Sequence, residues 1–392
     1  MGMLFPRVPP PVFRVTKLLY HVKTHRRFNT SSGVPKVDQA LQAISIVQFR
    51  DKSDDLSKPL LLRGEPGGSR QPAAVGGTLP AAGKWFVDGN ETRAVRLDFS
   101  YLEGGETHRD VSHRRLGRDG RGLKSFSSTT RSFLYPYEVM SPQLDSNGND
   151  AVLDFYNWVR NSIGEDDIPD ITTYRELLAS LLSIPMDSEK PRFHQILGPL
   201  WLLDLAQRYN AERPAGKGPV SFYMAQQPIS ELPKHLRGDL PTPRLALEAG
   251  RGDIYASSIW LGLEPTSTPL HRDPNHNIFT QLRGAKVVRL LRPEFGRRLF
   301  RAVQAELGAR GSPNMRGVEM MAGPERELLD HKVWAWGSAG SEEEDAGAPL
   351  EGMAEAVVRP GDSLFVPMGW WHSVKSEFAD GRLNASVNWW FR

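Results

Sequence analysis

The sequence predicts a mainly β protein, a sandwich or barrel preceded by a helical region, on two observations. Beyond residue 218, short runs of strand-forming residues alternate with turn residues, chiefly Gly and Pro. Between residues 150 and 210, apolar residues instead recur at helical spacing. The strand-like runs span residues 219–225, 253–263, 278–282, 284–291, 363–367 and 384–391.

The composition is that of a globular protein, and it excludes several kinds of site. Of the 392 residues, 39% are hydrophobic and 24% are charged, and the net charge of +3 is too small to indicate a nucleic-acid partner. There is no cysteine, so disulfides, zinc–thiolate sites and thiol catalysis are excluded, and a metal must be bound by His, Asp, Glu or other oxygen ligands. No apolar run approaches the ~20 residues that span a bilayer, so we expect no membrane span.

The chain opens with a basic leader, residues 1–34. The first 37 residues hold seven Arg or Lys and no Asp or Glu, and apolar residues recur at helical spacing among them. An acid-free, Arg-rich and amphipathic leader is typical of a mitochondrial transit peptide. The alternative is a disordered basic tail, which would be compatible with a cytoplasmic or nuclear protein.

An N-terminal α/β and helical region follows, at residues 35–217. Within it, residues 59–63, with three consecutive leucines, precede Gly64, which predicts a short buried strand that ends in a turn. The Gly-, Ala- and Pro-rich residues 66–83 and the polar, Arg-rich residues 104–124 are expected to be loops. RNA binding is an alternative role for the second loop, although no aromatic residues are interleaved there to stack on bases.

Three helices are predicted later in that region, where they would cover one side of a sheet, although a Gly-Pro pair at 198–199 disturbs the start of the third. A further helix is expected near residues 294–307, followed by a flexible insertion at about 308–354 that interrupts the β region. The residues that mark the three helices are Val152, Phe155, Tyr156 and Val159; Tyr174, Leu177, Leu178, Leu181 and Leu182; and Leu197, Leu200, Trp201 and Leu205.

Two candidate metal ligands, His271 and Asp273, are two residues apart in the segment 268–273. On an extended backbone this spacing places both side chains on one face of a strand, where an imidazole and a carboxylate supply two adjacent ligands to a divalent metal. The His-x-Asp pattern also occurs often by chance, so by itself it is a weak signal.

A third candidate ligand, His372, follows a predicted turn at 360–362 and a predicted strand at 363–366. This strand can deliver His372 from the opposite side of a barrel. Two His and one carboxylate on one face of a metal leave three positions open, which is the arrangement of non-haem Fe(II) oxygenases that bind a bidentate cosubstrate and O₂. The alternative for His372 is an ordinary core or surface histidine.

A lysine in the predicted strand 284–291 is expected to point into the protein. Lys286 falls on the same face as Val288 and Leu290, and Arg289 falls on the opposite face. A buried ammonium group needs an anionic partner, because an unpaired one is strongly destabilising or loses its proton. The far carboxylate of 2-oxoglutarate would be such a partner. If the faces are reversed, Lys286 is solvated and Arg289 is inward, unless the strand lies at an edge.

Together these segments resemble a known family. Residues 268–293, 360–372 and 386–390 are similar to those of the JmjC (cupin-like) oxygenases, in particular the branch that contains the asparaginyl hydroxylase factor-inhibiting HIF. The resemblance covers residues 218–392 well and implies that they form a catalytic double-stranded β-helix, or jelly roll, that encloses the metal. The long insertion departs from the family pattern. A weaker similarity lies at residues 60–64 and 81–86.

The resemblance also implies a site, with Fe(II) as the metal, 2-oxoglutarate as the cosubstrate and O₂ as the oxidant. Arg289 is a departure, since many relatives carry an apolar residue there. By their match to the family pattern, the metal ligands are His271, Asp273 and His372. The match also implies that the 2-oxoglutarate carboxylate is bound by Tyr223, Thr268 and Lys286. Asn277 and Asn388 match residues that line the cosubstrate pocket.

Hydroxylation of a protein side chain is the activity that the resemblance implies. Nothing in the residues selects the substrate, and lysine demethylation and hydroxylation of an RNA base are alternatives within the family. A non-catalytic cupin-type binding module is the alternative of another class, although the intact ligand set with Lys286 argues against it. An isomerase or storage cupin would add a further histidine; His276, five residues from His271, is expected on the other face or in a turn.

Overall fold

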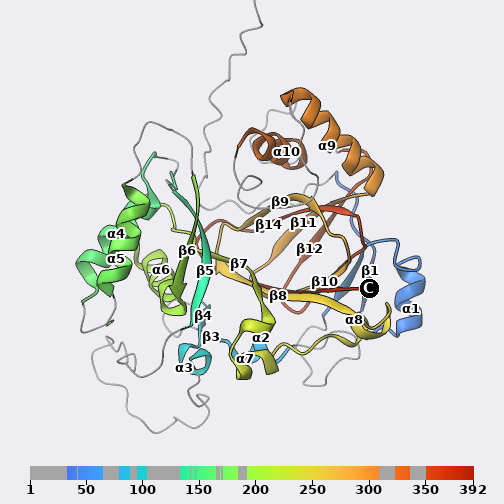
Figure 1. The fold of residues 1–392 in the computed structure, drawn as a ribbon, viewed down its shortest axis with the longest axis horizontal. Helices are drawn as coiled ribbons and strands as arrows, with labels where there is room; N and C mark the ends of the chain where they lie inside the picture. Colours follow the sequence, from blue (N-terminus) through green and yellow to red (C-terminus); the bar gives the residue numbers. More distant parts are fainter. Residues whose placement is uncertain are drawn as a thin grey trace, which may run out of the picture.

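The computed structural model has a β core with helices packed around it (Figure 1). The loop predicted at 104–124 and residues 1–32 of the basic leader lie outside the described residues. The structure describes residues 33–41, 43–64, 79–88, 95–103, 133–141, 143–145, 147–164, 168, 171–183, 192–308, 323–335 and 350–392.

Eight strands form a double-stranded β-helix, so the predicted jelly roll is confirmed. The chain alternates between two facing sheets, except that β11 and β12 follow one another in the same sheet (Figure 1). All neighbouring pairs within these two sets of strands are antiparallel. The larger sheet takes β13 (Ser363–Val366), β10 (His276–Arg283), β15 (Leu383–Phe391) and β8 (Ile254–Leu263) in that order, and the smaller one takes β12 (Met353–Val358), β11 (Lys286–Leu291), β14 (Trp371–Ser376) and β9 (Ser267–Arg272).

Strands that precede β8 in the chain extend both edges of the larger sheet. The strand predicted at 59–63 is β2 (Leu60–Arg63), which lies between β13 and β1 (Gln39–Leu41). At the other edge, β8 is followed in space by three strands. In the middle one, buried residues alternate with residues that are half-buried or exposed, as is typical of a strand. These three are β7 (Tyr223–Pro228), β5 (Leu134–Ser141) and β6 (Arg192–Pro199); a separate pair is formed by β3 (Phe86–Asp88) and β4 (Val95–Leu97).

The three predicted helices are present, with one correction. Leu197 does not belong to the third helix: it lies in β6, and its side chain is 59% exposed. The backbone before a proline is biased toward extended conformations, so the Gly-Pro pair ends a strand and the helix begins only at Leu200. Figure 1 shows the three helices beside β5 and β6. They are α4 (Ala151–Ser162), α5 (Ile171–Leu182) and α6 (Leu200–Glu212).

Several short helices surround the sheets. One of them includes residues 80–83, so the prediction of a loop at 66–83 was wrong for these residues. Pro80 occupies the first turn of a helix, where its missing N–H is not needed, and Ala81 is buried beneath it. None of the helices in the described part of the chain is long and apolar enough to cross a bilayer. The short helices are α1 (Ile46–Lys52), α2 (Pro80–Lys84), α3 (Phe99–Leu102), α7 (Lys234–Gly238), α8 (Arg244–Glu248) and the 3-10 turn Ile229–Glu231.

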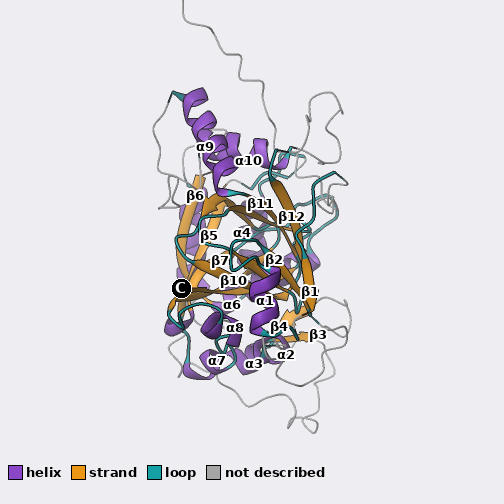
Figure 2. Ribbon diagram, turned by 90° about the vertical axis from the view of Figure 1, so that its right-hand side faces the viewer, coloured by secondary structure: helices purple, strands orange, loops and turns teal. Residues whose placement is uncertain are grey.

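Two longer helices cover the outer face of the smaller sheet, at the end opposite α2, α3 and α7 (Figure 2). The helix predicted near 294–307 is α9 (Pro293–Leu307). The second, α10 (Pro324–Trp334), lies inside the predicted insertion, so the expectation of a flexible segment was wrong for these residues. Their apolar side chains bury Val287 and Leu291 of β11.

β11 is buried along its whole length because each of its faces meets a separate apolar cluster. Val287 and Leu291 face α9 and α10, whereas Val288 and Leu290 pack between the sheets against Leu364 of β13. The two faces predicted for this strand are therefore confirmed. This arrangement directs Lys286, at the start of the strand, into the space between the sheets.

Candidate metal centre and adjoining pocket

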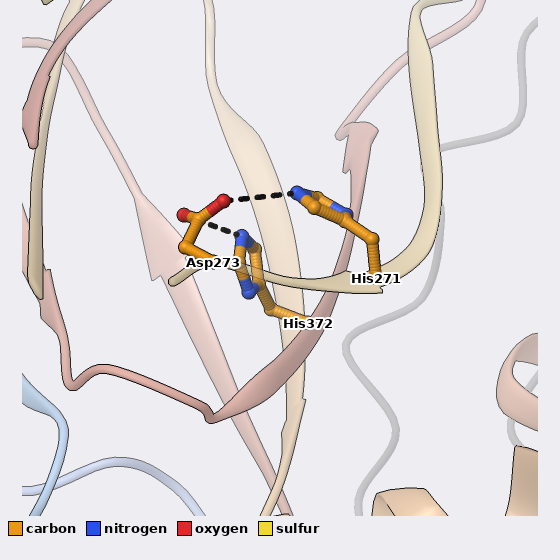
Figure 3. Close-up of side chains that lie close together, drawn as sticks. All are labelled: His271, Asp273 and His372. Carbon is orange, nitrogen blue, oxygen red and sulfur yellow. Dashed lines mark ion pairs between the residues drawn. The ribbon is translucent and has the colours of Figure 1, made fainter. Parts of the chain in front are cut away.

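The three predicted metal ligands meet in the space between the sheets (Figure 3). β9 and β14 are paired so that His271 lies directly opposite His372, and paired residues point to the same side of a sheet. Asp273 follows β9, and its carboxylate oxygens lie 3.8 Å from Nε2 of His271 and 3.6 Å from Nε2 of His372. One ligand atom from each residue lies within 4.8 Å of the others, which fits a single metal ion.

Backbone carbonyls fix the orientation of both imidazoles. Nδ1 of His271 lies 2.9 Å from the carbonyl oxygen of Pro269, and Nδ1 of His372 lies 3.2 Å from that of Trp370. Because a carbonyl oxygen only accepts hydrogen bonds, each Nδ1 carries the proton and donates it. Each Nε2 then keeps its lone pair and directs it toward the Asp273 carboxylate, as a metal ligand requires.

Burial and the neighbouring ligands set the protonation of the site. Burial, followed by the proximity of His271, lowers the pKa of His372 to about 4. Burial acts to raise the pKa of Asp273, but attraction to His372 and His271 and two hydrogen bonds together hold that pKa below its ordinary value. At neutral pH the site therefore presents a neutral His372 and a negative Asp273, which is the state that binds a divalent cation.

Asn277, predicted to line the cosubstrate pocket, lies in the same cavity and contacts a metal ligand. Its Nδ2 donates a hydrogen bond of 2.9 Å to Oδ2 of Asp273. The backbone N–H of Gly369 donates to the carbonyl oxygen of Asp273 at 3.0 Å. Contacts of this kind hold a ligand in place from outside the coordination sphere and change the affinity of the site for metal. Asn277 is therefore placed to position Asp273.

Lys286 lies in the same cavity as the three ligands. It is 2% exposed, and its Nζ donates to the hydroxyl of Tyr223 at 3.1 Å and to that of Ser386 at 2.9 Å. Burial lowers the pKa of Lys286 to about 7, and attraction to Glu264 acts in the opposite direction. Among the described residues, the hydrogen-bond partners of this ammonium group are hydroxyls and not carboxylates. An anion that enters the cavity would therefore meet a cation that lacks a direct counter-charge.

Tyr223 reaches Lys286 from the larger sheet because Gly262 leaves room for it. Tyr223 and Gly262 are paired across β7 and β8. A Cβ atom on residue 262 would lie 2.7 Å from Cα and 2.8 Å from Cδ2 of Tyr223, so a larger residue would displace the tyrosine. In the sequence, the only signal for this role is a glycine inside a strand-like run, which marks the close approach of another backbone.

Thr268 and Asn388 complete the predicted set. Thr268 is 8% exposed and lies on β9, and Oδ1 of Asn388 accepts a hydrogen bond of 2.8 Å from Nε1 of Trp260. All eight predicted site residues thus line one cavity. Of the other residues that line it, the sequence predicts only that Val288 shares the inward face of Lys286; the rest are Trp260, Phe279, Leu364, Val366, Val374 and Trp390.

His276 is not a fourth ligand. Its Nδ1 accepts a hydrogen bond of 3.1 Å from the N–H of Met368, and its ring lies against those of Phe365 and Phe391. On β10 the next residue, Asn277, faces the cavity, so His276 points to the other side of the sheet. The predicted orientation is confirmed.

Arg289 is satisfied on the outer face of β11. Its Nε donates to Oε2 of Glu355 at 3.0 Å, its Nη1 donates to the carbonyl oxygen of Val333 at 2.7 Å, and its guanidinium lies over the ring of Trp334. β11 is a central strand covered on both sides, so both Lys286 and Arg289 are buried, on different faces. The buried ion pair with Glu355 thus explains how this position holds an arginine, although many relatives carry an apolar residue there.

A buried acid near Lys286, Glu264, was not predicted. It is fully buried, Oε1 accepts a hydrogen bond of 2.8 Å from Nδ2 of Asn384, and Oε2 has no hydrogen-bond partner in the described part of the chain. Burial raises the pKa of Glu264 to about 8. Mutual attraction favours the charged form of both Glu264 and Lys286, so this acid supports the positive charge of the lysine.

The donors present fit a divalent metal and a dicarboxylate. Two imidazoles and one carboxylate on one side of an ion leave positions for a further bidentate ligand. A buried ammonium group and the Tyr223 hydroxyl, hydrogen-bonded to each other, suit the far end of such a ligand, because charge-assisted hydrogen bonds to a carboxylate are strong in a site shielded from water.

This fold and this site define the class of protein. A family model described as Cupin-like domain matches residues 187–392, more than half of the chain, and the chain belongs to that family. The match includes all eight predicted site residues and the strands that carry them.

Several similar proteins carry JmjC or Jumonji C names, which confirms the resemblance to JmjC proteins; the narrower branch stays a prediction. The chain is similar to Lysine-specific demethylase JMJ30 of Arabidopsis thaliana, at 30% identity over 177 residues, 43% of this chain and 33% of that protein. It is similar to Lysine-specific demethylase 8 of Danio rerio, at 25% identity over 43% of this chain and 36% of that one. The Jumonji C domain-containing protein 5 of Drosophila melanogaster is 25% identical to this chain, over 48% of this chain and 41% of that protein. The aligned segments thus cover well under half of these relatives.

Proposed function

We propose that this protein is an Fe(II)- and 2-oxoglutarate-dependent oxygenase. One observation carries the proposal: a single cavity holds the His271–Asp273–His372 cluster and the buried ammonium group of Lys286. A cluster that only binds metal has no need of a buried lysine beside it, whereas a cosubstrate with two carboxylates needs both. Membership of the cupin-like family and the JmjC names of its relatives support the same activity.

Each group of the cavity has a task in this proposal. His271, Asp273 and His372 hold Fe(II), which with 2-oxoglutarate and O₂ supplies the oxidising power to attack a C–H bond. Lys286 donates to the far carboxylate of 2-oxoglutarate, and the hydroxyls of Tyr223 and Thr268 add hydrogen bonds. Water is kept away by the apolar walls of the cavity, which come from Phe279, Val288, Leu364, Val366 and Val374.

We infer that the oxidised group belongs to a protein side chain. Hydroxylation is the first candidate. Lysine demethylation is the second, and the names of the relatives favour it. Hydroxylation of an RNA base is indicated only by the basic residues 104–124, which lie outside the described residues, and no name among these relatives supports it. Mass spectrometry separates the first two, because hydroxylation adds one oxygen atom to the substrate, whereas demethylation removes a methyl group as formaldehyde.

The test is substrate-independent turnover of 2-oxoglutarate. Purified protein is incubated with Fe(II), ascorbate and labelled 2-oxoglutarate, and succinate is measured. We expect succinate from the wild type, none from His271→Ala, and recovery of Lys286→Ala only at high 2-oxoglutarate concentration. Lys234→Ala is the matched control, because Lys234 is exposed on α7.

A non-catalytic binding module makes a different prediction. Such a module would form no succinate and would show no 2-oxoglutarate-dependent shift of Tm in the presence of a divalent metal. That pair of results would refute the oxygenase. Succinate formation that Lys286→Ala leaves unchanged at low 2-oxoglutarate would refute the role of this lysine.

A further inference from the structure

One face of β15 arranges the polar groups at one end of the metal cavity in a row. Alternate residues of a strand point to the same side of the sheet, so Asn384 and Ser386 share a face. Asn384 donates a hydrogen bond of 2.8 Å to Oε1 of Glu264. Ser386 accepts a hydrogen bond of 2.9 Å from Nζ of Lys286. The carboxyl group of Glu264 therefore follows the ammonium group of Lys286 along the strand.

The metal ligands lie further along the same face, in the other direction. Trp390, four residues beyond Ser386, hydrogen-bonds to the ligand Asp273. Two residues of a strand span about 7 Å, so the row runs from Glu264 through Lys286 to the metal ligands. A dicarboxylate that binds the metal would reach the lysine from the metal's side, whereas Glu264 faces the lysine from the opposite side.

Hydrogen bonds fix the carboxyl group of Glu264 relative to the backbone of the lysine. Asn384, which is fully buried, also donates to the carbonyl oxygen of Ala285, the residue before Lys286, at 3.1 Å. The side chain of Asn384 is held in turn by Nε2 of Gln281, which donates to its Oδ1 at 2.9 Å. Since the direct partners of Nζ are two hydroxyls, Glu264 acts on the lysine through its charge.

Three charged groups act on Glu264. Arg382 favours the charged form of Glu264 and Asp380 disfavours it, and both belong to the segment that leads into β15. These two residues form an ion pair with each other, so their effects partly cancel. The third group is Lys286, which lies inside the cavity and favours the charged form of Glu264.

Tyr223, which also faces Lys286, is uncharged. Burial, together with Glu138 directly opposite on β5, holds the pKa of Tyr223 well above its ordinary value. In the described part of the chain, Glu264 is therefore the charged group that acts on Lys286 before a ligand binds.

The effect of Glu264 on the lysine depends on pH. Burial raises the pKa of Glu264 to about 8 and lowers that of Lys286 to about 7. A carboxyl group attracts an ammonium group fully only once it has ionised. In acidic solution Lys286 is charged without this support. As the pH rises through about 8, Glu264 ionises and opposes the loss of the lysine's proton.

We propose that Glu264 is a positioning residue for the cosubstrate: it holds the charge on Lys286 from the side opposite the metal, and so extends binding of a dicarboxylate into alkaline solution. This inference rests on the proposed function, since it concerns the cosubstrate of that same site. Because the row places Lys286 between Glu264 and the metal, the attraction of Glu264 for the lysine exceeds its repulsion of the bound carboxylate.

The experiment compares Glu264→Gln with the wild type, because glutamine has the shape of a protonated glutamate. The Kd of 2-oxoglutarate is measured by isothermal titration with saturating Mn(II), at about pH 6 and about pH 9. We expect equal Kd values in acidic solution, where the glutamate is itself protonated. In alkaline solution we expect the Kd of the variant to be about tenfold higher, the effect of one nearby charge.

Two controls separate charge from structure. 2-Oxobutyrate has the same keto-acid end but no far carboxylate, so Glu264→Gln should leave its Kd unchanged at either pH. Arg251→Gln, at an exposed arginine, should leave the Kd of 2-oxoglutarate unchanged.

Arg382→Gln tests the same role from the surface and decides the question if Glu264→Gln does not fold. It removes a cation that favours the charged form of Glu264. We expect its Kd for 2-oxoglutarate to rise about two- to threefold in alkaline solution only.

Two outcomes overturn the inference. One is an equal Kd for the wild type and the folded Glu264→Gln variant in alkaline solution; the other is a loss of affinity of the same size at both pH values, which a structural role would produce. Wild-type protein that binds no 2-oxoglutarate in acidic solution contradicts the proposed function itself. Binding that Glu264→Gln leaves unchanged retains the oxygenase and removes only the role of this acid.

Discussion

Lys286 is a residue at which ligand binding and stability oppose one another. Burial lowers its pKa from 10.5 to about 7, so the folded chain binds this proton less tightly than the unfolded chain does. The resulting destabilisation is complete below pH 7 and disappears as the pH rises to the unfolded pKa of 10.5. We expect Lys286→Met to raise the free energy of unfolding by roughly 1–3 kcal/mol at pH 6.5, net of its lost hydrogen bonds, in urea denaturation.

The same variant is expected to lose binding of 2-oxoglutarate, measured by isothermal titration. Lys234→Met serves as the control, since Lys234 is exposed and should change neither quantity. A less stable Lys286→Met would show that the hydroxyls of Tyr223 and Ser386 compensate for the burial of the charge.

Asn277 acts on the metal through one hydrogen bond to Asp273. We expect Asn277→Ala to weaken metal binding about 10–100-fold, because groups that orient a ligand from outside the coordination sphere have effects of this size. Titration with Co(II), followed by its absorbance, measures the change. Asn388→Ala is the matched control: Asn388 lines the same cavity but hydrogen-bonds to Trp260 and not to a ligand. Equal losses in the two variants would argue against a positioning role for Asn277.

At the scale of elements, α9 supports the strand that carries His372. Gly296 faces the indole of Trp371, the residue before that ligand, and a Cβ atom at 296 would lie 2.1 Å from Cδ1 of the indole. Because Trp371 is 1% exposed, its ring has little room to move.

We expect Gly296→Ala to destabilise the protein by roughly 1–3 kcal/mol, the cost of an overpacked core, despite the higher helix propensity of alanine. It should also weaken metal binding by displacing His372. Thermal unfolding and Co(II) titration measure the two effects. Gly83→Ala is the control, because Gly83 is also helical and a Cβ atom added there would meet no other described atom within 4 Å. A Gly296→Ala protein as stable as the wild type would mean that α9 can shift away from β14.

At the scale of the whole molecule, the first described segment joins the two sheets. Lys36 and Val37 lie beside Glu355 of β12 in the smaller sheet, and the strand at 39–41 pairs with β2 of the larger one. Val34 packs into the apolar cluster outside the smaller sheet, whereas Val37 packs into the cluster between the sheets. The segment thus closes one side of the sandwich.

Deletion of residues 1–41 is expected to lower the free energy of unfolding by roughly 2–4 kcal/mol, because the buried Glu355 loses one of its two cations and two valines lose their packing. Deletion of residues 1–32 removes none of the described contacts and is the control. Urea denaturation of both proteins makes the comparison. Equal stability of the two would show that the sandwich is closed without this segment.

The basic leader is relevant to the cellular compartment in which the protein is found. We propose that residues 1–34 direct import into mitochondria, as their acid-free, Arg-rich composition indicates. A fluorescent fusion to the whole chain should colocalise with mitochondria, and a fusion lacking the leader should not. Identical distributions would favour the basic tail.

The sequence predicts the features that a short stretch of chain decides, such as the face on which a side chain lies and the presence of a helix. The period of a strand determined that Lys286 and Val288 share one face and that Arg289 takes the other. Helical spacing likewise identified α4 and α5. The same local reasoning failed at Leu197, where a Gly-Pro pair ended a strand, and at 80–83, where a proline began a helix.

The sequence by itself determined which chemical groups were available: two histidines and an aspartate as ligands, and a lysine on an inward face. Only the tertiary structure decided that His271 lies opposite His372, that Tyr223 reaches Lys286 past Gly262, and that Glu138 lies beside Tyr223. The physical reason is that local periodicity sets the face of each residue, whereas neighbours across a sheet depend on strand order and register. Order and register follow from how segments far apart in the chain bury their apolar faces together.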